Sequence, residues 1–441
     1  MSHGVLAHDR YSGGGNIMRD HELRLILNDE LHGRPGLPVS APARLTHLAF
    51  TIAEGDTDPL ANVKQLCDAL GLKPPAKGAA HHSVAIDNGL FKYERHGEFY
   101  QMSVIVADNG ARSEAIAALP MGWVDELPGK RLVAIHTHIR VKAAKPPAPA
   151  ELIDLFGHDD IACSLVSQGG ATIWTDFRIG ADGYTRMLVH DHGLSPLRLG
   201  RVTRRLHEIE TYRMMALLAF PLARRLLVEL GPLEKSLAST IDAMLQAKDT
   251  AEESSLLARL SAIARDVEDM SNRSSYRFAA ARAYEALVAK RIAELGEERV
   301  MSHQKLGVFL DRRFSPAMTT CLAVTERIAG LADRSERASN LLRTRVDIAL
   351  EAQNQQLLRS MEQRARLQLM LQETVEGLSV VAISYYMIGI VSKLIDGLEV
   401  YLPRLDTKLA NLMAIPLVVV LVWFGVRRVR RRVLRAAHER P

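Results

Sequence analysis

The segment GLSVVAISYYMIGIVS, residues 377–392, contains no charged residue. Lys393, Leu394 and Ile395 extend it to about 19 residues, close to the ~20 that a helix needs to cross a bilayer, since a terminal lysine can reach the membrane surface. A second run, LANLMAIPLVVVLVWFGV, residues 409–426, is also uncharged and carries Trp423 near its end, where aromatic side chains favour the membrane interface. The sequence therefore predicts a transmembrane hairpin over 376–426, with spans at about 377–395 and 409–426. A buried amphipathic helix is the alternative for the first run, which contains Ser379, Ser384, Tyr385 and Tyr386.

Arginines on both sides of the hairpin indicate its orientation. Arg359, Arg364 and Arg366 precede the first run, and the tail 427–441, RRVRRRVLRAAHERP, holds seven arginines and one glutamate. Because positive residues concentrate on the cytoplasmic side of a membrane, we expect both termini in the cytoplasm and the 396–408 loop outside.

The region before the hairpin, residues 197–375, reads as almost entirely helical. We expect breaks at Pro221 and at three further stretches: 230–235, 295–299 and 313–318. The final helix would then run from about Ser315 into the membrane as a stalk. Its apolar residues fall near three- and four-residue spacing, so it packs on preceding helices, in a coiled coil with copies of itself, or both.

Strand signals dominate the residues before this helical region. After an expected disordered tail at 1–19, the range 20–193 alternates strand-like runs with a few helices. The clearest strands are 44–54, 130–142 and a pair joined by the turn GADG at 180–183. The short apolar stretch 214–223 suits a buried core helix, because it is too short to span a bilayer. The fold class is therefore α+β: a mixed α/β domain at 20–193, a helical stalk region and a membrane hairpin.

Composition excludes several classes of protein. The chain has 441 residues and a formal net charge of +5, which lies largely in the arginine tail, so a nucleic-acid-binding surface is not expected. The three cysteines, Cys67, Cys163 and Cys321, are far apart, which argues against disulfides and a structural zinc site. The N-terminus has no apolar segment typical of a secretory signal. Catalytic and cofactor motifs are absent, so we expect neither an enzyme nor a cofactor.

Two His-x-His pairs and one arginine are the candidate ligand-binding residues. His136/His138 and His190/His192 each lie in a strand-like run, where residues two apart share a face and can offer two imidazoles to one metal ion. The alternative is that these histidines face solvent or fill hydrogen-bonded core positions. Arg34, between Gly33 and Pro35, could bind a carboxylate or phosphate, although pairing with an acidic neighbour is the simpler interpretation.

Three stretches carry a family resemblance: residues 28–50, 175–225 and 373–397. Together they resemble a bacterial family of membrane-anchored proteins that share a domain of unknown function. The order of parts also resembles CorA-type magnesium transporters, in which a cytoplasmic α/β domain is followed by a stalk helix and two membrane spans. The Gly-Met-Asn motif of that family is replaced here by the sequence from Gly389 to Lys393, so magnesium selectivity is not implied.

These resemblances imply a protein of the bacterial inner membrane. Its partners would be the lipid bilayer and further copies of the chain. As an oligomeric ion transporter or channel, it would line its pore with the small or polar residues of the first span and the lysine at its end, namely Ser384, Gly389, Ser392 and Lys393. A membrane-anchored scaffold or a ligand- or metal-sensing protein is the alternative.

Overall fold

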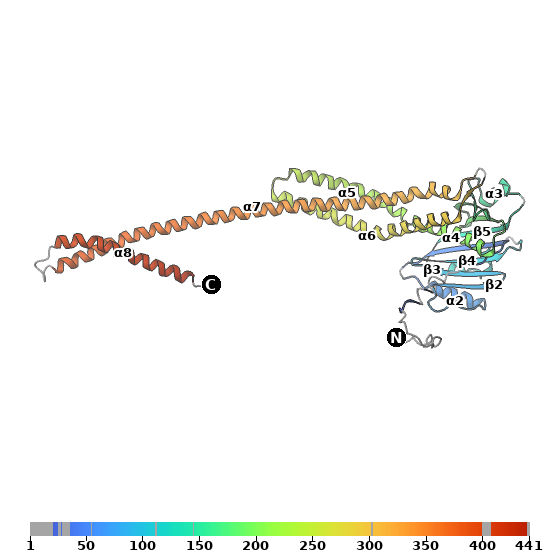
Figure 1. Ribbon diagram of the computed structural model, residues 1–441, viewed down its shortest axis with the longest axis horizontal. Coiled ribbons are helices and arrows are strands. Elements are labelled where there is room, and N and C mark those ends of the chain that lie inside the picture. The colour runs from blue at the N-terminus through green and yellow to red at the C-terminus, as the bar shows by residue number, and fades with distance from the viewer. Residues whose placement is uncertain are drawn as a thin grey trace, which may run out of the picture. The chain divides into compact units, whose positions relative to one another are not determined.

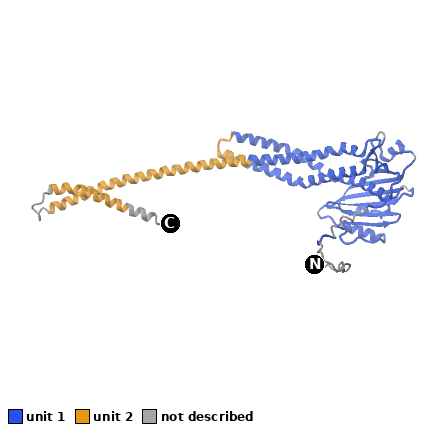
Figure 2. Ribbon diagram, viewed as in Figure 1, with its two compact units in different colours: residues 1–245, 258–338 blue, residues 246–257, 339–441 orange. Residues whose placement is uncertain are grey.

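The computed structural model describes residues 21–24, 28, 36–53, 55–110, 113–143, 145–300, 303–398 and 407–438. They belong to two compact units, one comprising 1–245 with 258–338 and the other 246–257 with 339–441 (Figure 2). The predicted tail at 1–19 and Arg34 lie outside the described residues. The first unit includes both the predicted α/β domain and much of the predicted helical region.

A nine-stranded sheet forms the centre of the first unit, with the order β2-β3-β4-β1-β5-β8-β7-β6-β9 (Figure 1). Its neighbours pair antiparallel except β5 and β8, which are parallel. The strands are β1 (Ala43–Thr51), β2 (His81–Ile86), β3 (Gly89–Arg95), β4 (Phe99–Ala107), β5 (Lys130–Val141), β6 (Ala162–Val166), β7 (Ala171–Ile179), β8 (Thr185–Asp191) and β9 (Glu298–Arg299).

One face of the sheet is apolar and is covered by short helices. Since strand side chains alternate between faces, Leu48, Phe91, Tyr93 and Met102 all point to this side and are fully buried or nearly so. α2 (Pro59–Ala69) and the 3-10 helices η1 (Ala115–Ala118) and η2 (Trp123–Glu126) pack on them. α3 (Pro149–Phe156) packs in the same way on β6, β7 and β8 through a core that includes Trp174.

The opposite face of the sheet lies against α4 (Pro196–Leu217), so both faces are buried. Helices α5 (Phe220–Gln246), α6 (Thr250–Leu295) and α7 (Leu306–Leu398) follow, and α8 (Thr407–His438) ends the described chain. The stretch 214–223 is not one helix, because α4 ends at Leu217 and α5 begins at Phe220, but it does belong to the core of the first unit, with Met215, Ala216 and Ala223 buried.

The strand predictions are confirmed closely, but two of the four predicted helix breaks are wrong. Breaks do occur near Pro221 and at 295–299, where the unexpected β9 adds to the edge of the sheet. In contrast, α5 continues through Pro232 and α7 through Pro316. Buried apolar side chains on both sides, such as Leu230 and Leu237 around Pro232, stabilise each helix more than one lost hydrogen bond costs.

α7 begins nine residues earlier than expected and changes character along its length. In the first unit its apolar residues are buried, among them Phe309, Val324 and Leu331. In the second unit, residues 351–375 are almost entirely exposed, so the single chain shows a long helix there and no coiled coil. α8 also continues past the predicted tail boundary to His438, because arginine and alanine are good helix formers.

A close backbone contact fixes α4 against the start of the described domain. The backbone N–H of Val39 donates to the carbonyl of Pro196 at 3.0 Å. A Cβ atom on Gly200 would lie 1.8 Å from the backbone oxygen of Leu37, which is closer than any side chain allows. Glycine at position 200 therefore lets the segment 36–39 cross the helix.

We expect Gly200→Ala to lower the free energy of unfolding by about 1–3 kcal/mol, the usual cost of forcing an extra group into a packed core. Chemical denaturation of the full-length protein in detergent measures this loss. Gly330→Ala is the matched control, because it lies in α7 with nothing within 4 Å of an added Cβ. That variant should be more stable than the wild type by about 0.5–1 kcal/mol. Wild-type stability of Gly200→Ala would show that the close approach is not required.

Candidate functional site

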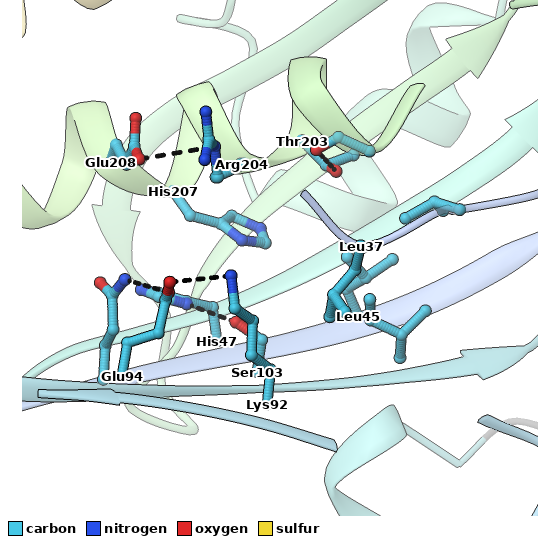
Figure 3. Close-up of a pocket in the computed structure, with 14 residues that line it drawn as sticks. Leu37, Leu45, His47, Lys92, Glu94, Ser103, Thr203, Arg204, His207 and Glu208 are labelled. Atoms are coloured by element: carbon cyan, nitrogen blue, oxygen red, sulfur yellow. Dashed lines mark hydrogen bonds and ion pairs between the residues drawn. The ribbon is translucent and has the colours of Figure 1, made fainter. Parts of the chain in front are cut away.

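A cavity of about 40 Å³ lies between α4 and strands β1, β3 and β4 (Figure 3). Polar side chains from all four elements point into it. His47 comes from β1, Lys92 and Glu94 from β3, Ser103 from β4, and His207 from α4. The strand register explains the grouping, because both Lys92 and His47 pair with Ser103 across β4.

A buried ion pair forms one wall of the cavity. Lys92 Nζ lies 2.8 Å from Glu94, and the Gln101 amide donates to the same carboxylate at 2.8 Å. Burial by itself would raise the pKa of Glu94, but the Lys92 ammonium and these hydrogen bonds lower it overall. Glu94 is therefore charged at neutral pH although its side chain is only 10% exposed.

Two histidines, one from the sheet and one from α4, stack with ring centroids 4.7 Å apart. His47 Nδ1 lies 2.9 Å from Ser103 Oγ and its Nε2 lies 3.2 Å from Thr211 Oγ1. His207 Nε2 lies 2.9 Å from Thr137 Oγ1. Burial, followed by the nearby His96 and Lys92 charges, lowers the pKa of His47 to about 3, and burial also lowers the pKa of His207 well below its ordinary value. Both imidazoles are therefore neutral at pH 7.

His47 and Ser103 resemble part of a catalytic nucleophile–base pair but differ from it in two respects. A serine hydroxyl hydrogen-bonded to a histidine is the first half of a nucleophile–base pair. In such pairs an acidic group orients the histidine and stabilises its charged form, whereas His47 meets the Thr211 hydroxyl instead. With a pKa of about 3, His47 is also a weak base at neutral pH. The cavity volume suits about three water molecules or one very small polar molecule.

The sequence did not single out this cluster, although it held two signals. His47 interrupts the apolar strand LTHLAF, and Lys92 and Glu94 alternate with the aromatic residues Phe91 and Tyr93. Alternation of this kind normally places charges in solvent. Here the second face is covered by α4, a long-range contact that a strand pattern does not encode.

The first His-x-His pair lies on β5 and meets a carboxylate. Glu114 lies 3.0 Å from His138 Nε2 and 3.8 Å from His136 Nδ1, and Thr46 Oγ1 lies 2.9 Å from that same His136 nitrogen. Burial lowers the pKa of His136 to about 4. The His138 hydrogen bond and the two imidazoles lower the pKa of Glu114, although its burial alone would raise it.

The second pair lies at the end of β8 and has other partners. His190 is buried against Trp174, with ring centroids 4.8 Å apart. His192 Nδ1 lies 2.8 Å from the backbone oxygen of Gly169. Within the described residues, no group of three or more His, Cys, Asp or Glu side chains could hold a metal ion. A metal ion at either pair stays a prediction of the sequence.

The hairpin residues predicted to line a pore separate into two sets. Ser384 is buried, and its hydroxyl has no hydrogen-bond partner among the described residues, whereas Ser392 Oγ donates to Asn411 Oδ1 of α8 at 3.0 Å and so faces the partner helix of the same chain. Gly389 and Lys393 are exposed. By length and composition, the C-terminal part of α7 and the stretch Lys408–Val429 of α8 could each cross a membrane. In each helix, 6% of the most apolar stretch is buried.

We expect the free energy of unfolding to fall as the pH drops from 6.5 toward 5. A histidine with a lowered folded-state pKa takes up its proton only on unfolding, so His47, His207 and His136 each cost up to ~1.4 kcal/mol per pH unit in this window. The carboxylates Glu94 and Glu114, whose pKa values are lowered, lose their contribution only at more acidic pH.

The variant His47→Gln should reduce the slope of the free energy of unfolding against pH by the contribution of one histidine. This expectation holds even if the variant is less stable than the wild type at every pH. Denaturation midpoints between pH 7.5 and 5.0 measure the slope. His81→Gln, at an exposed position of β2, is the matched loss of a histidine and should keep the wild-type slope. An unchanged slope in His47→Gln would contradict a buried neutral imidazole.

Comparison with known proteins places the chain in a family. A family model described as "Protein of unknown function (DUF3422)" matches residues 19–433, nearly the whole chain. No curated protein and no solved structure matches it. The resemblance to a family defined by a domain of unknown function is thus confirmed, and the likeness to CorA-type transporters receives no support. The chain belongs to the DUF3422 family of proteins of unknown function.

Proposed function

We propose that this protein is anchored in a bilayer by its C-terminal hairpin and presents its α/β unit at the membrane surface. The exposed apolar surface of the hairpin carries the proposal. In α7, Leu378, Val381 and Leu394 are each more than 60% exposed, and Leu417 and Leu421 of α8 are 64% exposed. Water penalises such surface by ~25 cal/mol per Å², a cost that lipid tails remove.

An anchor fits the hairpin better than a pore. Two of its polar side chains, Ser392 and Asn411, bond to each other between the two helices of one chain, and Ser379 Oγ donates to the Val375 carbonyl at 2.8 Å. Polar groups that already have partners within the hairpin are less available to line a water-filled path. A CorA-like transporter, with Gly389 and Lys393 at the pore, is the competing hypothesis. Ion flux in proteoliposomes separates the two, because an anchor gives no flux above lipid alone.

The bacterial inner membrane, with both termini in the cytoplasm, is the location that the charges favour. Arginines flank the hairpin on the side of both termini. The Arg427 guanidinium lies 4.8 Å from the centre of the Trp423 ring, a cation–aromatic pair suited to the membrane interface. In this orientation the α/β unit lies in the cytoplasm, where we propose a binding or scaffold role and no catalysis.

We further propose that copies of the chain associate through α7. Leu350, Leu357, Leu371 and Leu378 recur at multiples of seven residues and are 48–73% exposed, with Arg364 at the remaining position of the repeat. This spacing is typical of helices that pack along one seam. Another copy is the partner that fits, because its α7 enters the same bilayer and therefore runs parallel and in register.

Cysteine labelling tests the anchor and its orientation. Val400→Cys should react with a membrane-impermeant maleimide in intact bacterial cells, and Ala437→Cys only after permeabilisation. The native thiols give little background, because all three are buried and burial raises the pKa of Cys163 to about 12 and that of Cys321 to about 11. A chain of residues 1–375 should leave the membrane fraction. Protected Val400→Cys or reactive Ala437→Cys in intact cells would invert the topology.

Oxidative crosslinking tests the association of copies. Leu357→Cys in membranes should give a disulfide-linked dimer, because the seam brings two copies of this position together. Gln355→Cys is the matched control, equally exposed but about 160° away around the helix, and should crosslink far less. Equal crosslinking at both positions would indicate random collision and count against the seam.

A further inference from the structure

A second cavity of about 130 Å³ lies in the first unit, where β7, α4 and the first turns of α7 meet. Three arginines, Arg178, Arg213 and Arg313, line it together with apolar side chains. The apolar part of the lining consists of Phe177, Phe309, Phe314, Leu217 and Leu310. Arginines beside an aromatic wall are the combination that recognises an organic anion.

A strained β-bulge forms the floor of this cavity. The pairing of β7 with β8 shifts between Thr175 and Ile179, and inside the bulge Phe177 has a φ of 54°, in the left-handed region that a bulky residue rarely adopts. The Phe177 ring packs 6.0 Å from that of Phe309, and the Arg213 guanidinium lies 5.6 Å from the Phe177 ring centre. Such conformations persist where the surrounding structure holds them, and they cluster at binding sites.

The arginines are unequally neutralised. Arg213 makes a two-pronged contact with Glu210, at 2.9 and 2.6 Å, and its guanidinium is thereby occupied. Arg178 and Arg313 both donate to one oxygen of Asp160, at 3.1 and 2.8 Å. The lining also includes the carboxylate of Asp176, which contacts His158 at 2.8 Å and accepts from the backbone N–H of Arg178.

Two guanidiniums that share one carboxylate oxygen leave N–H donors for a second anion. Each guanidinium carries five N–H groups in a planar fork that matches a carboxylate or phosphate. Arg178 and Arg313 are also about half exposed, so a ligand can reach them from solvent. The Arg313 guanidinium carbon lies 3.8 Å from the centre of the Phe309 ring, a cation–aromatic contact at the edge of the apolar lining.

We propose that this cavity binds a small organic anion, with its carboxylate or phosphate on Arg178 and Arg313 and its apolar part against Phe309 and Phe314. The volume of about 130 Å³ matches a single ring, since a cavity of ~150 Å³ holds benzene in another protein. The inference goes beyond membrane anchoring and does not depend on it, because every residue involved belongs to the first unit.

Calorimetric titration of the full-length protein in detergent tests the site with three probes. Phenyl phosphate should bind saturably, and inorganic phosphate and the neutral benzyl alcohol should each bind at least tenfold more weakly. Phenyl phosphate should also raise the unfolding temperature, as any ligand of the folded state does. No saturable binding of phenyl phosphate at millimolar concentration would overturn the proposal. Equal affinity for inorganic phosphate would overturn its apolar half.

Variants locate the binding. Arg178→Gln and Arg313→Gln should each weaken phenyl phosphate binding about tenfold or more, the worth of one charge-assisted hydrogen bond of ~1.5 kcal/mol or above. Arg337→Gln, an exposed arginine on the same helix that pairs with Asp333, is the matched control and should bind as the wild type does. If Arg313→Gln does not fold, Arg178→Gln carries the test. Wild-type affinity in folded Arg178→Gln would place the probe elsewhere and overturn the assignment.

Discussion

The buried Lys92–Glu94 pair is the contact on which the packing of sheet and helices depends. Taking two charges out of water costs several kcal/mol for each ion, and attraction at 2.8 Å repays this only when further hydrogen bonds complete the pair. Gln101 supplies one of these bonds. The charges point toward α4. This helix and the segment 36–39 must therefore close a polar cavity over them. At the same time, the apolar face on the other side of β3 must stay buried.

α4 meets this requirement by presenting different chemistry to each neighbour. Leu199, Leu206 and Ile209 are buried in the apolar core, whereas His207 and Thr211 bond to the sheet through Thr137 and His47. Glu208 pairs with Arg291 of α6, and Glu210 holds Arg213 at the second cavity. A further ion pair, Arg277 with Glu98 at 2.7 Å, joins α6 to the sheet. One helix thus connects both cavities with the helices that follow.

Sequence patterns were sufficient where the determining force is local. Strand-like patterns located β1, β5, β7 and β8, and the absence of charge over two long runs located the hairpin helices. These patterns failed where contacts between residues far apart in the sequence determine the structure. Pro232 and Pro316 predicted helix breaks that do not occur, because packing against other helices compensates for each proline. β9 has two residues, and its partner strand lies over 130 positions earlier in the sequence. The polar cavity likewise depends on α4 covering a strand pattern that looks half-exposed.

The two cavities differ in how completely the protein satisfies its own charges, and this difference separates structure from ligand binding. In the first, Lys92 and Glu94 pair with each other, both imidazoles are neutral, and the volume of about 40 Å³ leaves room for little beyond water. Its polar groups specify how α4 docks on the sheet. In the second, Arg178 and Arg313 compete for one oxygen of Asp160 beside a cavity of about 130 Å³. Phe177 is also held in a left-handed backbone conformation, a strain that is commoner at binding sites than elsewhere. The N–H donors of the two guanidiniums that Asp160 does not use, together with the apolar lining, are therefore the basis for proposing an anion that binds from solvent.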